Sequence, residues 1–218
     1  MANDKTNVKS TLKDSFETLK LVFTKPSTKA LDKTKDFSDA KKAGIFAGIA
    51  LVTYVIINIL SAIISTVVTK SWTGKTNVDF NNLNNFDFFK TLGDNLLYIA
   101  LAIALVAAVI YVMGLVFKKQ PNFTKVLGIA AAGFAPYYAA SFVGMILAYF
   151  WAPLNTFVLV AGFSLMAAFI VNGVNKETGL EGDKKIFFHV ATVTAIAAIA
   201  YFIVTNIIKT SILSGFSF

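Results

Sequence analysis

The chain has 218 residues, of which 56% are hydrophobic and only 15% are charged. A soluble domain of this length could not bury so much apolar surface, so the composition indicates an integral membrane protein. All 20 basic residues are lysines and there is no cysteine, which argues against arginine-based recognition of nucleic acid and excludes disulfides and thiolate metal sites.

The first 42 residues form a polar tail. Its apolar residues recur at spacings of four, four, three and four, which predicts an amphipathic helix over about residues 8–24, ending before Pro26. Such a helix can lie in the cytoplasmic membrane interface, dock on a partner or pack along the spans of its own chain. The rest of the tail, 25–42, is predicted to be a solvated connector with room for one more helical stretch. The apolar stripe consists of Val8, Leu12, Phe16, Leu19 and Phe23.

Five apolar stretches follow the tail. A span needs roughly 20 mostly apolar residues to cross the hydrocarbon layer. The predicted fold is therefore all-α: a polytopic bundle of five transmembrane helices over residues 43–213, with the cytoplasmic amphipathic helix before it and a short outer end at 214–218 after it. The spans are predicted at 43–69, 96–117, 126–150, 154–174 and 186–208.

The lysines orient this bundle. If the amino terminus is cytoplasmic, the inner segments 1–42, 118–125 and 175–185 hold ten, three and three lysines, whereas the outer segments 70–95 and 209–218 hold three and one. The positive-inside rule then predicts a multi-pass protein of the cell membrane with a cytoplasmic amino terminus and an extracellular carboxyl terminus. The formal net charge of +8 reflects this topology and contact with anionic lipid head groups.

A proline interrupts the third predicted span, within the sequence GIAAAGFAPYY at 128–138. A loop there would add a span and move the lysine-bearing segment 175–185 to the outside, so a bend within one helix is favoured. Proline donates no backbone hydrogen bond and frees the carbonyl four residues earlier. We predict a kink that packs against another span, formed by Gly133, Phe134, Pro136, Tyr137 and Tyr138.

The predicted spans contain few groups that carry chemistry. They include one histidine and no cysteine, aspartate or glutamate. The only catalytic arrangement for hydrolysis that these residues could form is a serine nucleophile, Ser141 or Ser164, with His189 as its base. The spacing of these residues does not support this arrangement. We therefore expect no enzymatic activity, no cofactor and no metal. His189, near the cytoplasmic start of the fifth span, is either a functional intramembrane group or a structural residue, and the structural role is favoured. In that role it reaches the lipid head groups or hydrogen-bonds Asn172 or Asn175.

Two other asparagines, Asn58 in the first span and Asn206 in the fifth, are expected to find polar partners in the bundle. Small residues four positions apart allow helices to approach closely, in internal packing or in oligomers, and internal packing is favoured. The outer loop 77–89, rich in asparagine and phenylalanine, is predicted to anchor at the outer interface rather than to bind a ligand. The small-residue pairs are Gly44 with Gly48 and Gly144 with Ala148.

Three segments resemble bacterial members of the YIP family, relatives of the eukaryotic Ypt/Rab-interacting membrane proteins. SFETLKLVFTKPS (15–27) is similar to the family's amphipathic segment that ends in proline. QPNFTKVLGIAAAGFAPYY (120–138) resembles its third span, where Gly133 and Phe134 fill a glycine–tyrosine position without the tyrosine hydroxyl. VNGVNKETGLEGDKK (171–185) is similar to its loop between the fourth and fifth spans. The resemblance implies a five-span bundle with a cytosolic amino terminus, and the arginine-free composition favours a bacterial source.

The resemblance also bears on function. Eukaryotic members are membrane-trafficking adaptors for small GTPases, a system that bacteria lack. The sequence favours a non-enzymatic membrane adaptor or scaffold that binds other membrane proteins or lipids through its tail helix and lateral helix contacts. The competing hypothesis is a transporter, channel or permease subunit for a neutral or lipidic molecule, resting on the proline-broken span and on Asn58, Asn172 and Asn206. The expected partners are the lipid bilayer and another membrane protein or a second copy of the chain.

Overall fold

The computed structural model describes residues 2–25, 28–34, 39–70 and 76–203, which are nearly all helical. The elements, in chain order, are α1 (Ala2–Thr24), α2 (Thr28–Thr34), α3 (Ala40–Val67), β1 (Val68–Lys70), β2 (Thr76–Val78), the 3-10 helix η2 (Phe80–Asn85), α4 (Phe88–Val116), α5 (Phe123–Gly133), α6 (Ala135–Ala148), α7 (Pro153–Thr178) and α8 (Gly182–Ile203).

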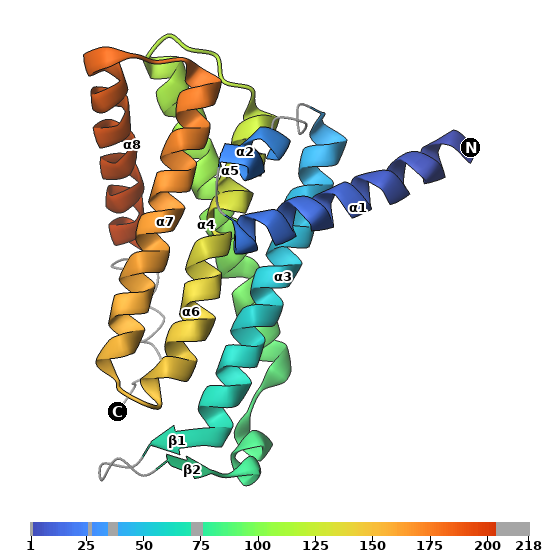
Figure 1. Cartoon of the computed structure of the whole chain (residues 1–218), viewed down its shortest axis with the longest axis vertical. Helices are drawn as coiled ribbons and strands as arrows, with labels where there is room; N and C mark the ends of the chain where they lie inside the picture. The colour runs from blue at the N-terminus through green and yellow to red at the C-terminus, as the bar shows by residue number, and fades with distance from the viewer. Residues whose placement is uncertain (1, 26–27, 35–38, 71–75, 204–218) are drawn as a thin grey trace.

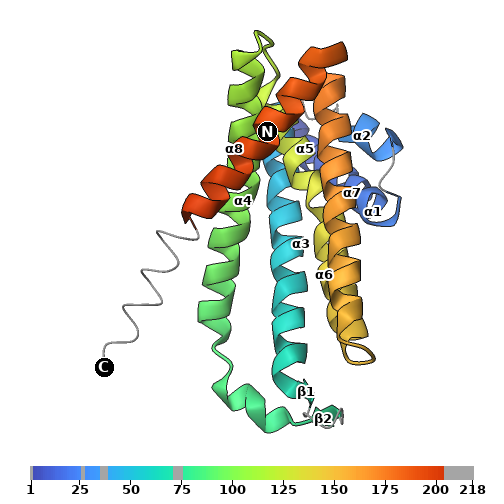
Figure 2. The same cartoon turned by 90° about the vertical axis from the view of Figure 1, so that its left-hand side faces the viewer.

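The long helices α3, α4, α5–α6 and α7 run side by side along the long axis of the molecule (Figures 1 and 2). The tail helices α1 and α2 and the α4–α5 and α7–α8 connections lie toward one end, which we call the tail end. The strands β1 and β2, η2 and the α6–α7 turn lie at the other, the hairpin end. Helix α1 runs across α3 rather than along it, and α8 slants past α4 (Figure 2).

Four helical segments are long and apolar enough to cross a membrane: α3, α4, α5–α6 taken as one segment of 26 residues, and α7. They coincide with the first four predicted spans, so the chain is a multi-pass membrane protein in contact with the lipid bilayer. Helix α8 covers the predicted fifth span from 186 to 203. Residues 204–208, with Asn206, and the outer end 214–218 lie outside the described residues, so the fifth span and the side of the carboxyl terminus stay predictions.

Two spans are longer than predicted because polar residues extend them. Helix α4 begins at Phe88, eight residues before the predicted start, since the Asp87 side chain caps it by accepting the Lys90 N–H at 2.9 Å. Helix α7 continues four residues past position 174 to Thr178. It ends where Gly179 takes the left-handed conformation (φ 57°) that closes many helices. Both boundaries were predicted at the point where the sequence changes from apolar to polar residues, but each helix continues past that point.

At the hairpin end the otherwise helical chain forms a small antiparallel sheet, which the all-α prediction did not include. Its β-branched residues fit a pleated strand better than a helix. The loop predicted at 77–89 is divided among β2, η2 and the start of α4. Phe80 and Phe89 in this region are 70% and 82% exposed. The paired residues are Val68 with Val78, Thr69 with Asn77 and Lys70 with Thr76.

The tail helix α1 is longer than predicted and buries a different face. It begins at Ala2 rather than near residue 8. Of the predicted apolar stripe, Leu19 is buried and Val8 and Phe23 are half-buried. Leu12 and Phe16 are 39% and 58% exposed. Small hydroxyl side chains let a helix approach its neighbour more closely than large apolar ones do, and these line the contact instead. The buried face consists of Thr11, Ser15, Thr18, Leu19 and Val22.

The predicted solvated connector after α1 contains α2, which belongs to the packed core. Ala30 and Leu31 are buried. Leu31 reaches toward Gly173 of α7, where an added Cβ would lie 3.0 Å from the Leu31 side chain and 2.6 Å from Ile129 of α5. The sequence reading missed this docking because two apolar residues among lysines give too short a pattern to indicate a buried face.

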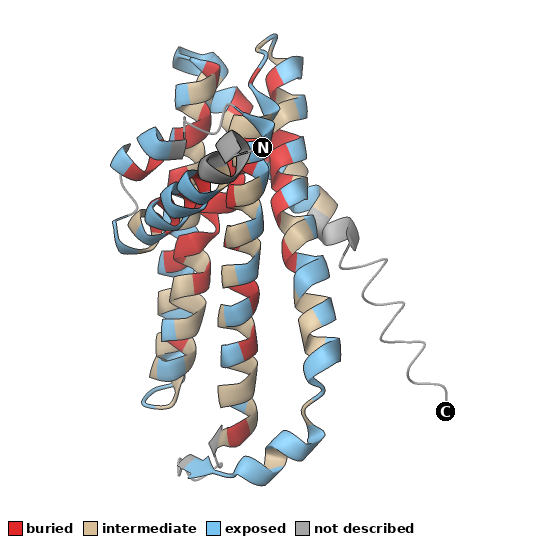
Figure 3. Ribbon diagram, turned by 90° about the vertical axis from the view of Figure 1, so that its right-hand side faces the viewer, coloured by how far each residue is buried: buried red, intermediate tan, exposed pale blue. Residues whose placement is uncertain are grey.

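Helix α5 is the central helix of the bundle. Every residue from Gly128 to Pro136 is buried, and α3, α4 and α7 all pack against α5. Its alanines and glycines let several helices approach at once. Buried residues are denser toward the tail end, whereas the hairpin end is mostly exposed (Figure 3).

Candidate functional site

The predicted bend lies at Phe134, where the helix is interrupted between α5 and α6. Pro136 is buried in the first turn of α6, a position where a helix needs no proline N–H. The interruption leaves carbonyls at the end of α5 without helical donors. Tyr54 of α3 donates its hydroxyl to one of them, the Ala131 carbonyl, at 2.5 Å. The bend therefore packs against another span, as the sequence predicts.

An aromatic cluster surrounds this bend. The Tyr54 ring stacks on Tyr138 with centroids 4.6 Å apart and planes 18° apart, and Phe23 of α1 meets Tyr54 edge-on at 6.2 Å. Tyr137 and Phe134 contact the Tyr138 ring at 5.5 and 6.3 Å. The hydroxyl at the bend comes from Tyr54, a residue that the sequence analysis did not select. The tail helix, the first span and the third span meet at this cluster.

Two predicted glycines, Gly133 at the end of α5 and Gly144 of α6, lie where these helices approach α7 most closely. A Cβ on Gly133 would collide with Ile170 of α7. A Cβ on Gly144 would lie 2.6 Å from the Asn155 side-chain oxygen. Ala148, the other member of that predicted pair, is half-buried in the last turn of α6. Small residues therefore let α6 and α7 form a closely packed helical hairpin.

The other predicted pair, Gly44 and Gly48, makes no such contact. Both are exposed, and among the described residues nothing lies within 4 Å of the position that a Cβ would take. Internal packing, which the sequence favoured, is therefore wrong for this pair. Val52 and Ile56, one and two turns further along α3, are 53% and 51% exposed. We call these four residues the outer face of α3.

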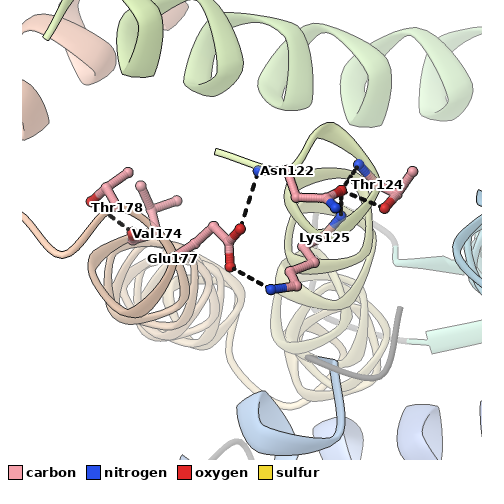
Figure 4. Close-up of polar contacts among 6 residues, drawn as sticks. All are labelled: Asn122, Thr124, Lys125, Val174, Glu177 and Thr178. Atoms are coloured by element: carbon pink, nitrogen blue, oxygen red, sulfur yellow. Dashed lines mark hydrogen bonds and ion pairs between the residues drawn. The ribbon is translucent and has the colours of Figure 1, made fainter. Parts of the chain in front are cut away.

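A polar cluster joins α5 to α7 at the tail end (Figure 4). Glu177 accepts the Asn122 backbone N–H at 3.1 Å and pairs with Lys125 at 3.3 Å. Asn122 also caps α5, since its side chain accepts the Thr124 N–H at 2.9 Å. The Lys125 and Glu177 side chains are only 28% and 15% exposed, so water screens this pair less than an ordinary surface pair. Glu177 lies 55 residues from Asn122 in the sequence, and no local pattern connects the two.

Two further ion pairs hold α2 in place. Lys176 of α7 lies 3.0 Å from Asp32 of α2, and Lys33 of α2 lies 3.6 Å from Glu17 of α1. All four side chains are at least one-third exposed, so each pair contributes little on its own. Together they connect α1, α2 and α7 at the tail end.

His189 lies beside one of its two predicted partners. Its Nε2 is 2.7 Å from the Asn175 side-chain oxygen, whereas Asn172 is exposed. The preceding residue, Phe188, is buried and meets Phe117, the residue that follows α4, edge-on at 5.4 Å. His189 thus connects the start of α8 to the end of α7.

Within the part of the chain that the structure describes, the polar groups of the spans do not converge on one place. Asn58 of α3 donates to the side-chain oxygen of Asn95 at 2.9 Å, and Asn95 donates to the Thr91 carbonyl at 2.8 Å. Asn95 lies just outside the predicted second span, which is why the sequence did not identify it as the partner. This pair belongs to the half of α3 that leads to the hairpin end, whereas His189 and Asn175 lie at the tail end.

The serines considered for catalysis lie on α6 and α7. Ser164 is exposed and donates its hydroxyl to the Val160 carbonyl at 2.9 Å. Ser141 is half-buried on α6. The described residues contain no group of three His, Asp or Glu side chains that could hold a metal ion.

The Yip1 domain family model matches residues 20–205 of the chain. The match includes α2, the aromatic residues around the bend and the polar cluster between α5 and α7. No curated protein and no solved structure matches the chain.

Proposed function

Because the chain belongs to the Yip1 domain family, we propose that it is a non-enzymatic adaptor or scaffold of the cell membrane that binds another membrane protein. The observation that carries the proposal is the docking of α1. The helix turns its small hydroxyl side chains toward the bundle and leaves Leu12 and Phe16 exposed. These two residues lie one turn apart and form an apolar patch on a helix that the bundle holds in a fixed position.

The charge around this patch suits a contact surface at the cytoplasmic side. Lys9 and Lys13 are exposed next to Leu12, and Glu17 next to Phe16 is engaged with Lys33 of α2. When a partner covers apolar side chains that would otherwise face water, the free energy of the complex is lowered. A partner helix with an apolar stripe and acidic flanks would match this patch.

The outer face of α3 supports a second, lateral contact within the membrane. Glycines four positions apart let the backbone of another helix approach closely, which increases van der Waals contact. Flexible lipid chains fill such a surface without needing glycine. Since the described fold does not use Gly44 and Gly48, a partner helix is the occupant that this face suits.

A transporter or channel role has less support. It requires polar groups that line a common path through the bundle. Asn58 is engaged with Asn95, and Asn175 with His189 at the tail end, so these residues do not line one path. Flux of neutral or lipidic solutes into proteoliposomes that contain the purified chain would favour the transporter instead.

Site-directed photo-crosslinking in the native membrane tests the adaptor proposal. A photoreactive phenylalanine analogue replaces Phe16 on α1 or Val52 on the outer face of α3, and replaces Phe89 at the hairpin end as a matched exposed control. We expect discrete protein adducts from positions 16 and 52 that are absent from position 89. Substituting Leu12 by Ala should weaken the adduct at position 16 and leave the one at position 52 unchanged. Only lipid adducts at both positions would contradict the proposal.

The proposal includes the predicted orientation, with the amino terminus in the cytoplasm. The absence of cysteine makes single-cysteine labelling direct. We expect Asn77→Cys in intact cells to react with a membrane-impermeant maleimide, and Lys9→Cys to react only after permeabilisation. The reverse pattern would invert the topology and would place the α1 patch outside.

A further inference from the structure

A hollow lies where the end of α1 meets α6 and α7. Its volume is about 330 Å³, and apolar residues and one glycine line it. Phe23 contributes from α1, Ala139 and Ala140 from α6, and Ala161 and Gly162 from α7. We call this hollow the α6–α7 groove.

The groove exists because the facing residues of α6 and α7 are small. A Cβ on Gly162 would collide with Ala140 and would lie 3.1 Å from the Pro136 carbonyl oxygen, so the two helices are in close contact there. The alanines on either side carry no atoms beyond Cβ that could fill the space in front of this contact. On α6 the lining runs from Pro136 to Val143, which is roughly 10 Å along the helix. A narrow apolar furrow of this shape fits an extended hydrocarbon chain.

The surroundings of the groove indicate where its occupant comes from. Both α5–α6 and α7 are candidate membrane spans, and no residue from Val126 to Asn175 is charged. Ala161 and Leu165 of the lining are exposed, so the groove opens sideways from the bundle. Since the groove lies between two candidate spans, we expect it to face the hydrocarbon of the bilayer, where acyl chains are the molecules available to fill it.

Charge distinguishes the two ends of the groove. The end of α1 lies beside the start of α6 (Figure 1), and Lys20 and Lys25 stand three residues before and two residues after Phe23. Both lysines are exposed. The turn between α6 and α7 at the other end has no charged residue. An anionic head group is therefore attracted to the α1 end.

We infer that the α6–α7 groove binds one acyl chain of an anionic phospholipid from the leaflet next to α1, with the head group beside Lys20 and Lys25. This site goes beyond the adaptor role and does not depend on it, since Leu12, Phe16 and the outer face of α3 do not line the groove.

Native mass spectrometry of the purified full-length chain tests the groove. The detergent-solubilised protein is supplied with phosphatidylglycerol or with phosphatidylcholine of the same acyl chains. We expect one tightly held phospholipid, which Ala161→Trp displaces by filling the groove. Ala168→Trp is the matched control, because Ala168 is also exposed on α7 but does not line the groove. Equal thermal stability of the two variants would show that the bundle remains folded.

A second pair of variants tests the head group. Each lysine close to an anionic lipid contributes about fivefold in affinity, so Lys20→Gln with Lys25→Gln should remove the preference for phosphatidylglycerol. Binding should fall to the level of phosphatidylcholine. Lys9→Gln with Lys13→Gln, on the distant half of α1, should keep the preference. Equal retention of both lipids by the unmodified chain, or unchanged binding by the Ala161→Trp variant, would overturn the inference.

Discussion

The tail end and the hairpin end of the bundle are built in different ways. At the tail end, α1, α2, α5 and α7 are connected by buried side chains, by stacked rings and by three ion pairs. At the hairpin end, η2 buries no residue, and Phe80 and Phe89 are mostly exposed. The polar tail is therefore part of the fold, whereas the hairpin end mainly connects one span to the next.

The largest effect is expected at the aromatic cluster. Tyr54→Ala removes a fully buried ring, its stacking on Tyr138 and its hydrogen bond to Ala131. We expect a loss of about 3–5 kcal/mol in the free energy of unfolding, measured by thermal or denaturant unfolding in detergent. Tyr98→Ala, at an exposed position of α4, should change stability by less than about 0.5 kcal/mol. Equal losses in both variants would mean that the cluster does not organise the tail end.

A smaller loss is expected when the contact between the bend and α7 is overpacked. Gly133→Val forces new atoms into Ile170, which should cost about 1–3 kcal/mol. Gly93→Val is the matched control near the hairpin end, since nothing within the described residues lies within 4 Å of a Cβ at that position. The same unfolding measurement should show the control within about 0.5 kcal/mol of the parent chain. A neutral Gly133→Val would contradict the close approach of α5 and α7 at the bend.

The polar cluster between α5 and α7 should contribute about 1 kcal/mol. A double-mutant cycle with Lys125→Gln and Glu177→Gln isolates this coupling from the loss of each charge. Because the pair is partly shielded, the coupling should persist at moderate salt. A coupling energy of zero would show that the Lys125–Glu177 ion pair adds nothing to the packing of α5 against α7 and the Asn122 backbone contact with Glu177.

The smallest effect is expected for the exposed pair between α2 and α7. Asp32→Asn should lower stability by less than about 1 kcal/mol, and added salt should remove the difference. Hydrogen exchange should nevertheless detect faster opening of α1 and α2, with no change in β1, β2 or η2. Faster exchange at the hairpin end would show that the two ends of the bundle unfold together rather than independently.

Apolar length predicted the first four spans, because a run of about 20 apolar residues in a membrane has few alternatives to a helix. The bend could be predicted as well, since Pro136 acts on the backbone regardless of what surrounds it. The lysine distribution predicts which end of the bundle faces the cytoplasm, and the membrane side of each end stays a prediction.

The contacts between distant segments could not be predicted. Tyr54 gives no local signal that its hydroxyl meets the Ala131 carbonyl 77 residues away. Likewise, Gly44 with Gly48 and Gly144 with Ala148 are similar patterns, but only Gly144 lies in a close contact. Which small-residue pair is buried depends on the arrangement of helices around α5. The apolar stripe of α1 did not identify the buried face of this helix for a related reason. Its small hydroxyl side chains allow a closer contact with the bundle than leucine and phenylalanine would.

The enclosure of α5 also bears on biosynthesis. The α5–α6 segment has a mean hydropathy of 1.5, whereas α3, α4 and α7 reach 2.2 or more. A segment that is surrounded by neighbouring helices needs few large apolar side chains in the finished fold. During synthesis, before those contacts form, such a segment partitions poorly into lipid. We therefore expect the third span to enter the membrane inefficiently by itself and to be retained there by α3 and α4, which are synthesised before it.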